Sequence, residues 1–530
     1  MSDALSAFIQ AYTTQVEPLY QALNVAYWNF TTTSDAAAEQ AYTQLVTEAR
    51  ALHSDRARFE QLKQLRTSAN GDELLARQAT LIQNTFQANQ LPRELIEQIT
   101  ALETEIQSEF NAFRAEINGQ KVTDNQLKKV LREATASAEV RRAWAASKQI
   151  GVQVADRVRQ LARLRNQGAH QSGFENYYGM SLALDELDQA ELFNLFERLD
   201  ELTRPLFVDY KAALDRQLAQ RFHIPVEQLR PWHYGDPFFQ EVPPDPALNL
   251  DAYFAGKDIV AITRRFFQII GLPVDDVIER SDLYEREGKE QHAYCTDIDR
   301  RGDVRVLANV QPNEQWMATM LHECGHAVYD KFQDRSLPYL LRAPAHTLST
   351  EAIAMLMGRL TTHPAWLVRY AGLTPAEAKQ LGARLHAQLR DQLLIFTRWC
   401  LTLCNFERAI YRDPEQDLES LWWSLVEKYQ MLRRPEQPPA SAWAAKIHIG
   451  AAPVYYQNYL LGEMNCSQLT EYILSHVVRG DTDRFVSDPA VGRFLVERFF
   501  RIGARYPWND ALKHATAEPL KPEYFVKHLH

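Results

Sequence analysis

Glycine and proline are distributed unevenly along this chain of 530 residues, and this distribution commits much of it to helices. No glycine precedes Gly71, and no proline lies between Pro92 and Pro205. The sequence between those prolines is rich in Ala, Leu, Glu, Gln and Arg, which favour helix. Within residues 95–113, apolar side chains recur at three- and four-residue steps, as in an amphipathic helix. Residues 1–200 are therefore predicted to form long helices joined by short turns, such as the one at 118–119.

One segment departs from the helical pattern. Residues 291–298 and 303–308 flank a turn at 300–302, which predicts a short β-hairpin. Clustered prolines predict a loop at 225–246, and helical patterning resumes at 260–270. The predicted fold class is mostly α, with a small β-hairpin.

Composition excludes several classes of partner. The net charge is −10 and no run of Lys and Arg occurs, so a nucleic-acid partner is not expected. No apolar stretch approaches the ~20 residues of a membrane helix, and the start of the chain lacks signal-peptide features. No membrane partner is therefore expected. Five cysteines without paired spacing do not form a disulfide framework, which favours a reducing compartment, the cytoplasm.

A metal-binding pattern, His-Glu-x-x-His, is formed by His322, Glu323 and His326. Two histidines at i and i+4 share one face of a helix, where their imidazoles can converge on a tetrahedral zinc ion. The glutamate beside the first histidine is placed to take a proton from zinc-bound water. Pro312 is expected in the first turn of this helix, and Cys324 on its opposite, core face. One catalytic Zn²⁺ per chain is predicted.

A third protein ligand is needed, because a catalytic zinc site usually has three and leaves one position open. A third histidine six residues after the second is excluded, because positions 329 and 332 hold Tyr329 and Phe332 instead of Gly and His. The other common solution is a glutamate on a following helix. Between residues 335 and 376 the only acidic residue is Glu351, which is therefore the predicted ligand.

Two histidines, His346 and His363, remain alternative ligands. The helix that carries Glu351 is expected to begin shortly before it, with Thr347 or Ser349 as the N-cap.

His322-Glu323-x-x-His326, followed 25 residues after His326 by Glu351, resembles the gluzincin zinc peptidases. The spacing is similar to that of the thimet oligopeptidase-like family. Several flanking motifs are similar to the peptidyl-dipeptidase family of angiotensin-converting enzyme, namely those at residues 27–31, 422–425, 428–430, 446–449 and 507–512.

This resemblance runs discontinuously over nearly the whole chain and implies one catalytic domain, residues 1–530. It implies a helical, ellipsoidal fold with a deep central cleft and a small β-hairpin beside the zinc helix. Within it, lid helices are expected in residues 1–120, the hairpin and zinc core in 290–365, and the wall that stabilises the oxyanion and binds substrate in 420–460.

The resemblance also assigns roles in residues 446–459. His448 and Tyr459 match a histidine and a tyrosine that donate hydrogen bonds to the tetrahedral oxyanion, as amide hydrolysis requires. Lys446 and Tyr456 match residues that bind the C-terminal carboxylate of the substrate in the converting enzyme. Tyr455 is the alternative to either tyrosine, so which of Tyr455 and Tyr456 faces the substrate stays open.

A further match concerns the hairpin. His292-Ala293 resembles the His-Ala pair of an edge strand that binds the substrate backbone by β-augmentation.

Two departures from the converting enzyme bear on specificity. Its chloride-binding arginines are replaced here by Val426 and Asn458, so chloride activation is not expected. No glutamine clearly matches the one that helps to hold the substrate carboxylate, and Lys257 is only nearby. The resemblance therefore implies the chemistry and leaves the mode of cleavage open.

The function implied is a zinc metallopeptidase that hydrolyses short unfolded peptides, including release of C-terminal dipeptides, with Glu323 as the general base. An endo-acting oligopeptidase or a carboxypeptidase of the same clan is the alternative. Outside the enzymes, the alternative is a helical peptide-binding protein with a vestigial zinc site. The presence of Glu323, His448 and Tyr459 argues against that last interpretation.

Overall fold

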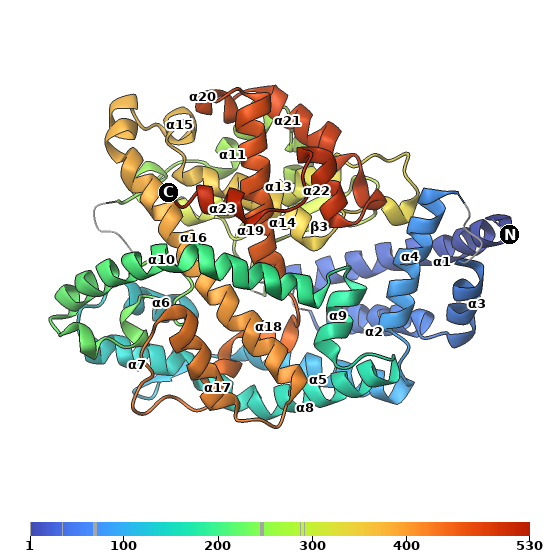
Figure 1. Cartoon of the computed structure of the whole chain (residues 1–530), viewed down its shortest axis with the longest axis horizontal. Coiled ribbons are helices and arrows are strands. Elements are labelled where there is room, and N and C mark those ends of the chain that lie inside the picture. Colours follow the sequence, from blue (N-terminus) through green and yellow to red (C-terminus); the bar gives the residue numbers. More distant parts are fainter. Residues whose placement is uncertain (1, 34, 67–70, 244–247, 287, 291) are drawn as a thin grey trace. The chain divides into compact units, whose positions relative to one another are not determined.

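The computed structural model describes residues 2–33, 35–66, 71–243, 248–286, 288–290 and 292–530 (Figure 1). These residues form α-helices almost throughout, interrupted by short 3-10 and π turns and by two antiparallel two-stranded sheets. The predicted mostly α fold is confirmed. Among the described helices, none combines the length and the apolar character needed to cross a bilayer.

The chain is divided into two compact units. Unit 1 comprises residues 1–90, 248–386 and 461–528, and unit 2 comprises residues 91–247, 387–460 and 529–530. Two helices, α16 (Pro375–Arg412) and α19 (Gln457–Tyr472), contribute residues to both units. The single catalytic domain, its three functional regions, its ellipsoidal outline and its cleft stay predictions.

Unit 1 contains the hairpin predicted at residues 291–308 and most of the C-terminal helices. Its helices are α1 (Ser2–Thr33), α2 (Ala36–His53), α3 (Arg56–Arg66), α4 (Glu73–Ala88), α11 (Ile259–Ile269), α12 (Asp275–Arg280), α13 (Glu314–Lys331), α14 (Thr347–Gly358), α15 (Pro364–Trp366), α20 (Thr482–Phe485), α21 (Pro489–Leu495), α22 (Trp508–Thr516) and α23 (Pro522–Lys527).

The centre of unit 1 is the packing of α13 against α14 (Figure 1). Helix α14 is apolar on nearly every side, and residues 351–357 are all buried. A helix of this composition is stable only when surrounded by other elements. Gly325 permits the close approach, because a Cβ at that position would lie 2.7 Å from the Cα of Ala354.

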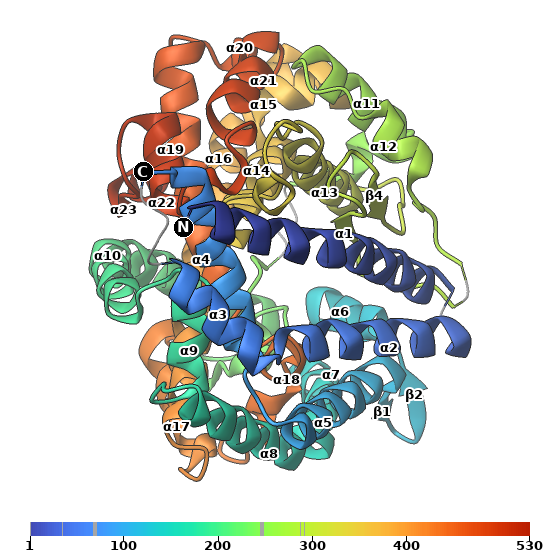
Figure 2. The same ribbon diagram turned by 90° about the vertical axis from the view of Figure 1, so that its right-hand side faces the viewer.

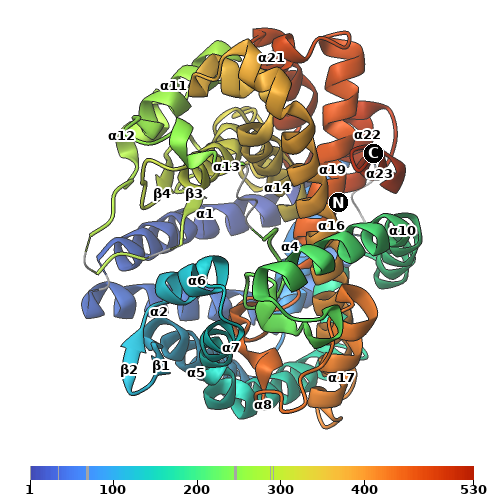
Figure 3. The same cartoon turned by 90° about the vertical axis from the view of Figure 1, so that its left-hand side faces the viewer.

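The predicted hairpin beside the helix that carries His322 and His326 is confirmed. Strands β3 (Tyr294–Asp297) and β4 (Val304–Leu307) pair antiparallel and pack against α13. Helix α1 runs along the hairpin (Figures 2 and 3), where the Asn24 amide donates hydrogen bonds to the carbonyls of Asp297 and Ile298 at 3.1 and 3.2 Å.

Strand β3 is shorter at its start than the predicted segment 291–298. His292 and Ala293 precede the strand, and Gln291 lies outside the described residues. The backbone N–H of His292 donates to the side chain of Glu290 at 3.2 Å instead of to a strand partner, which explains where the ladder ends.

Unit 2 contains the helices of the middle of the chain. They are α5 (Arg93–Ala112), α6 (Asp124–Glu133), α7 (Ser137–Ser147), α8 (Gln149–Gln171), α9 (Tyr177–Leu184), α10 (Gln189–Phe222), α17 (Leu418–Leu425) and α18 (Ile447–Ala451).

A second hairpin in unit 2 corrects the prediction that Asn118-Gly119 joins two helices. The turn joins β1 (Ala115–Ile117) to β2 (Gln120–Val122), next to α7 (Figure 3). Asn118 and Gly119 both have positive φ, 54° and 80°, which suits a two-residue hairpin turn. The amide of Gln149 bonds both the N–H and the carbonyl of Glu116 at 2.9 Å, and so anchors the hairpin to α8.

Candidate functional site

Helix α13 carries His322, Glu323 and His326, of which Glu323 is buried and the two histidines are partly exposed. Asn313 is its N-cap, and the amide oxygen of Asn313 accepts from the N–H of Trp316 at 2.9 Å. The expectation that Pro312 occupies the first turn is therefore wrong, since the asparagine after it caps the helix. The predicted core position of Cys324 is confirmed, because this side chain is fully buried.

Helix α14 supplies Glu351, which is only 4% exposed. The predicted N-caps, Thr347 and Ser349, are wrong. The cap is His346, whose Nδ1 accepts from the N–H of Leu348 at 3.0 Å. The helix therefore begins earlier than expected, and Glu351 lies in its second turn instead of its first.

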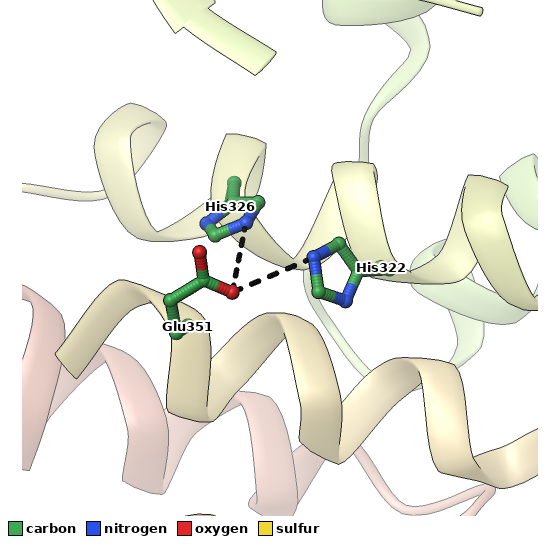
Figure 4. Close-up of side chains that lie close together, drawn as sticks. All are labelled: His322, His326 and Glu351. Carbon is green, nitrogen blue, oxygen red and sulfur yellow. Dashed lines mark ion pairs between the residues drawn. The ribbon is translucent and has the colours of Figure 1, made fainter. Parts of the chain in front are cut away.

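The side chains of His322, His326 and Glu351 converge (Figure 4). Their potential ligand atoms all lie within 4.8 Å of one another. Glu351 Oε2 is 3.7 Å from His322 Nε2 and 3.8 Å from His326 Nε2. Ligands bonded to zinc at about 2.0–2.2 Å in a tetrahedron are separated by roughly 3.3–3.6 Å. The two glutamate–histidine distances thus exceed this separation by only a few tenths of an ångström, which suits the predicted trio to zinc. His346 and His363 are not among the clustered groups of the described residues.

The surroundings of the trio also suit a metal ligand set. Thr350 Oγ1 lies 2.7 Å from His326 Nδ1, so that contact orients the ring with Nε2 toward Glu351. Burial lowers the pKa of His322 to about 4 and lowers that of His326 as well, so both imidazoles are neutral at pH 7. Neutral imidazoles and a carboxylate are the donors that Zn²⁺ binds, and the residues present therefore fit zinc.

Glu323 follows His322 directly and is 7% exposed. Burial raises its pKa to about 8, and the neighbouring Glu351 carboxylate adds to the rise. A pKa this close to neutrality lets the side chain both accept and release a proton beside the ligand trio.

Glycine 462 fixes the space behind Glu351. A Cβ at this position would lie 3.0 Å from Glu351 Cβ and 3.3 Å from Met355 Sδ. Both neighbours are buried in α14, so neither can move freely. An added Cβ would therefore push Glu351 or α19 by a few tenths of an ångström.

We expect Gly462→Ala to lower zinc affinity about 10–100-fold, the usual cost of disturbing the support of a metal ligand. The measurement is competition for zinc with a chromophoric chelator. Gly382→Ala is the matched control, because Gly382 also lies in a helix and an added Cβ meets nothing within 4 Å. Equal zinc affinity in the two variants would contradict a role for Gly462 in placing Glu351.

The predicted backbone-binding pair, His292 and Ala293, lies at the start of the hairpin in unit 1. The His292 side chain is 86% exposed, and its Nδ1 is 3.1 Å from Glu290 Oε1. The role of the pair in binding substrate stays a prediction.

Unit 2 gathers the predicted aromatic residues of segment 446–459. The ring centroid of Tyr456 lies 4.9 Å from that of His448 and 5.2 Å from that of Tyr459. The Tyr455 ring is 5.1 Å from Tyr459. Trp399 donates its indole N–H to the Tyr456 hydroxyl at 2.8 Å. Tyr456 is 4% exposed, whereas Tyr455 and Tyr459 are partly exposed.

Sequence reasoning missed Gln240, which completes a cluster with Lys446 and Tyr456. Lys446 Nζ donates to Gln240 Oε1 at 2.9 Å, and the Tyr456 hydroxyl lies 3.5 Å from the same oxygen. The Gln240 amide nitrogen faces Asp236 Oδ2 at 3.4 Å, which turns the oxygen toward Lys446. We call Gln240, Lys446 and Tyr456 the Lys446 cluster.

No spacing rule could have found Gln240. It lies in the proline-rich loop predicted at 225–246, 206 residues before Lys446. Lys257 is near the position in the sequence where the carboxylate-binding glutamine of the converting enzyme is expected. It lies in unit 1, where its ammonium donates to the carbonyl of Ala371.

The Lys446 cluster carries one cationic side chain. Burial lowers the pKa of Lys446 to about 8, while the carboxylate of Asp236 partly offsets that shift. Gln240 presents its amide oxygen, an acceptor, to this cluster, so the ammonium and the phenol are the donors suited to a carboxylate.

Two family models match the chain. The model of peptidase family M3 matches residues 277–530, and the model of angiotensin-converting enzyme matches residues 2–234. The chain thus resembles the gluzincin peptidases of both families, as its motifs predicted. The first match includes every predicted metal, catalytic and substrate-binding residue.

Individual relatives are distant. Carboxypeptidase 1 of Bacillus subtilis (strain 168) is 26% identical over 270 residues, 45% of this chain and 52% of that protein. The inactive angiotensin-converting enzyme-related protein of Caenorhabditis elegans is 23% identical over 56% of this chain and 37% of its own length. Angiotensin-converting enzyme of Rattus norvegicus is 22% identical over 74% of this chain and 32% of its own. The chain therefore spans between a third and a half of these relatives.

Proposed function

We propose that this protein is a zinc metallopeptidase acting on short unfolded peptides. The observation that carries the proposal is the convergence of His322, His326 and Glu351, with Glu323 next to the first ligand. The resemblance to two peptidase families supports it. The inactive relative makes a peptide-binding protein with a vestigial site the competing proposal, and Glu323 favours the enzyme.

His322, His326 and Glu351 would hold the metal. Zinc bound there would supply a Lewis acid that polarises the peptide carbonyl and acidifies water. Glu323 accepts a proton from the attacking water while the water oxygen forms a bond to the carbonyl carbon. Glu323 then returns the proton to the leaving nitrogen as the C–N bond breaks.

His448 and Tyr459 are proposed to donate hydrogen bonds to the oxyanion, and this assignment rests on their resemblance to the converting enzyme. Two donors aimed at developing negative charge stabilise the transition state more than the ground state. The contact of their rings with Tyr456 in unit 2 supports a common function.

Recognition of a free C-terminal carboxylate is proposed for the Lys446 cluster, which favours an enzyme that cleaves from the C-terminus. Release of dipeptides follows the resemblance to the converting enzyme, and release of single residues would follow the resemblance to Carboxypeptidase 1. Mass spectrometry of products from a mixed peptide library separates these modes from internal cleavage. Bound zinc without any product would support the peptide-binding alternative.

We expect Lys446→Ala to raise KM for peptides with a free C-terminus about 10–100-fold, and for their C-terminal amides much less, since a charge-assisted bond is lost. In the parent, KM for the free acids should rise above pH 8, because the cation is lost as pH passes its pKa of about 8. Steady-state kinetics on matched acid and amide peptides measures both. Equal effects on acid and amide would assign Lys446 a structural role and favour internal cleavage.

A further inference from the structure

Val454 has an unusual backbone conformation in the segment between His448 and Tyr459. Its φ is 52°, in the left-handed region. A β-branched residue seldom adopts this region, because its Cβ collides with the backbone. Val454 is also 7% exposed, so water cannot satisfy its polar groups. Such a conformation persists only where the surrounding structure imposes it.

Two buried side chains form hydrogen bonds to the backbone of Val454, one to its N–H and one to its carbonyl. Glu407 Oε1 accepts from the Val454 N–H at 2.7 Å. The Gln457 amide donates to the Val454 carbonyl at 2.6 Å. Glu407 is 3% exposed and Gln457 fully buried. We call this pair of contacts the Val454 clamp.

The clamp lies where it can set the position of the aromatic residues. Val454 comes two residues before Tyr456 and five before Tyr459. Helix α16 contacts the segment twice, through Glu407 at the Val454 backbone and through Trp399 at the Tyr456 hydroxyl. The direction of the chain at Val454 therefore determines how α19 begins and where both tyrosines lie.

We propose that Glu407 and Gln457 are positioning residues, which hold Val454 left-handed and thereby place Tyr456 and Tyr459 for the proposed peptidase reaction. This inference rests on the proposed function for its effect on catalysis. The effect on the position of Tyr456 is independent of that function.

Glu407→Leu removes the acceptor while keeping an apolar volume in the same place. We expect kcat/KM to fall about 10²-fold, as for small misplacements of catalytic groups. Glu407→Gln retains an oxygen that can accept from Val454, and should keep most activity. In the double variant Glu407→Leu/Val454→Gly, glycine adopts positive φ without steric cost, so part of the loss should be recovered, while the N–H of residue 454 still lacks its acceptor.

Fluorine NMR of protein containing fluorotryptophan reports on the clamp without reference to activity. The Trp399 resonance, assigned with Trp399→Phe, should shift in Glu407→Leu and return in the double variant, because its indole bonds Tyr456. Thr402→Val is the control, since it removes a buried hydrogen bond within α16 that does not reach this segment. If Glu407→Leu does not fold, Gln457→Leu removes the other contact and should move the same resonance.

The outcomes separate the two proposals. A Trp399 resonance that does not move in the clamp variants, or an activity loss that Val454→Gly does not recover, would overturn the positioning role. A resonance that shifts and returns while activity stays constant would support the clamp and contradict the proposed role of the tyrosines.

Discussion

Glu323→Gln is expected to bind one zinc ion per chain as the parent does, and to lose about 10³–10⁴-fold in kcat. The amide is nearly isosteric with the carboxylate but cannot take the proton of the attacking water. The three clustered side chains, His322, His326 and Glu351, remain unchanged. Metal analysis of the purified protein and peptide hydrolysis measured on the same sample test both parts of this expectation.

Two companion variants make the result specific. Glu351→Ala should lose zinc affinity itself, because one of the three convergent donors is removed. Glu415→Gln is the control, since Glu415 is an exposed glutamate paired with Arg163 in unit 2. Full activity in Glu323→Gln would exclude Glu323 as the base. Undiminished zinc affinity in Glu351→Ala would require another third ligand.

The convergence of His322, His326 and Glu351 was predictable because each position depends on a short stretch of sequence. His322 and His326 share a helix face by spacing alone. Glu351 could be placed beside them because it is the only acidic residue between residues 335 and 376, whatever its exact place in the helix. The N-cap of α14 was not predictable, because His346 caps the helix through an imidazole nitrogen, which is not among the preferred capping groups.

Features that depend on distant contacts were not predictable from spacing. Gln240 reaches Lys446 only through the folded loop. Gly462 shows no pattern that links it to Glu351, because its role is the absence of a side chain where two helices meet. The hairpin at 115–122 was missed although Asn118-Gly119 is a strong turn signal, because its strands are three residues long and lie between helical segments.

Tyr459→Phe is expected to lower kcat about 10²–10³-fold with little change in KM, as for the loss of other oxyanion donors. The change removes one hydroxyl and keeps the ring. The centroid of this ring lies 6.2 Å from that of His448 and 6.4 Å from that of Phe396. Packing in unit 2 should therefore be retained. Steady-state kinetics on a single defined peptide measures the two constants separately.

The neighbouring tyrosines provide matched controls for this expectation. Tyr455→Phe should have a much milder effect on kcat. Tyr456→Phe removes a hydroxyl that bonds Trp399 and lies near Gln240, so it should raise KM for free-acid peptides more than it lowers kcat. A larger loss of kcat in Tyr455→Phe than in Tyr459→Phe would mean that Tyr455, the alternative tyrosine, is the oxyanion donor. His448→Leu then tests the oxyanion assignment itself, because leucine cannot donate a hydrogen bond and a lost oxyanion donor lowers kcat whichever tyrosine acts with it.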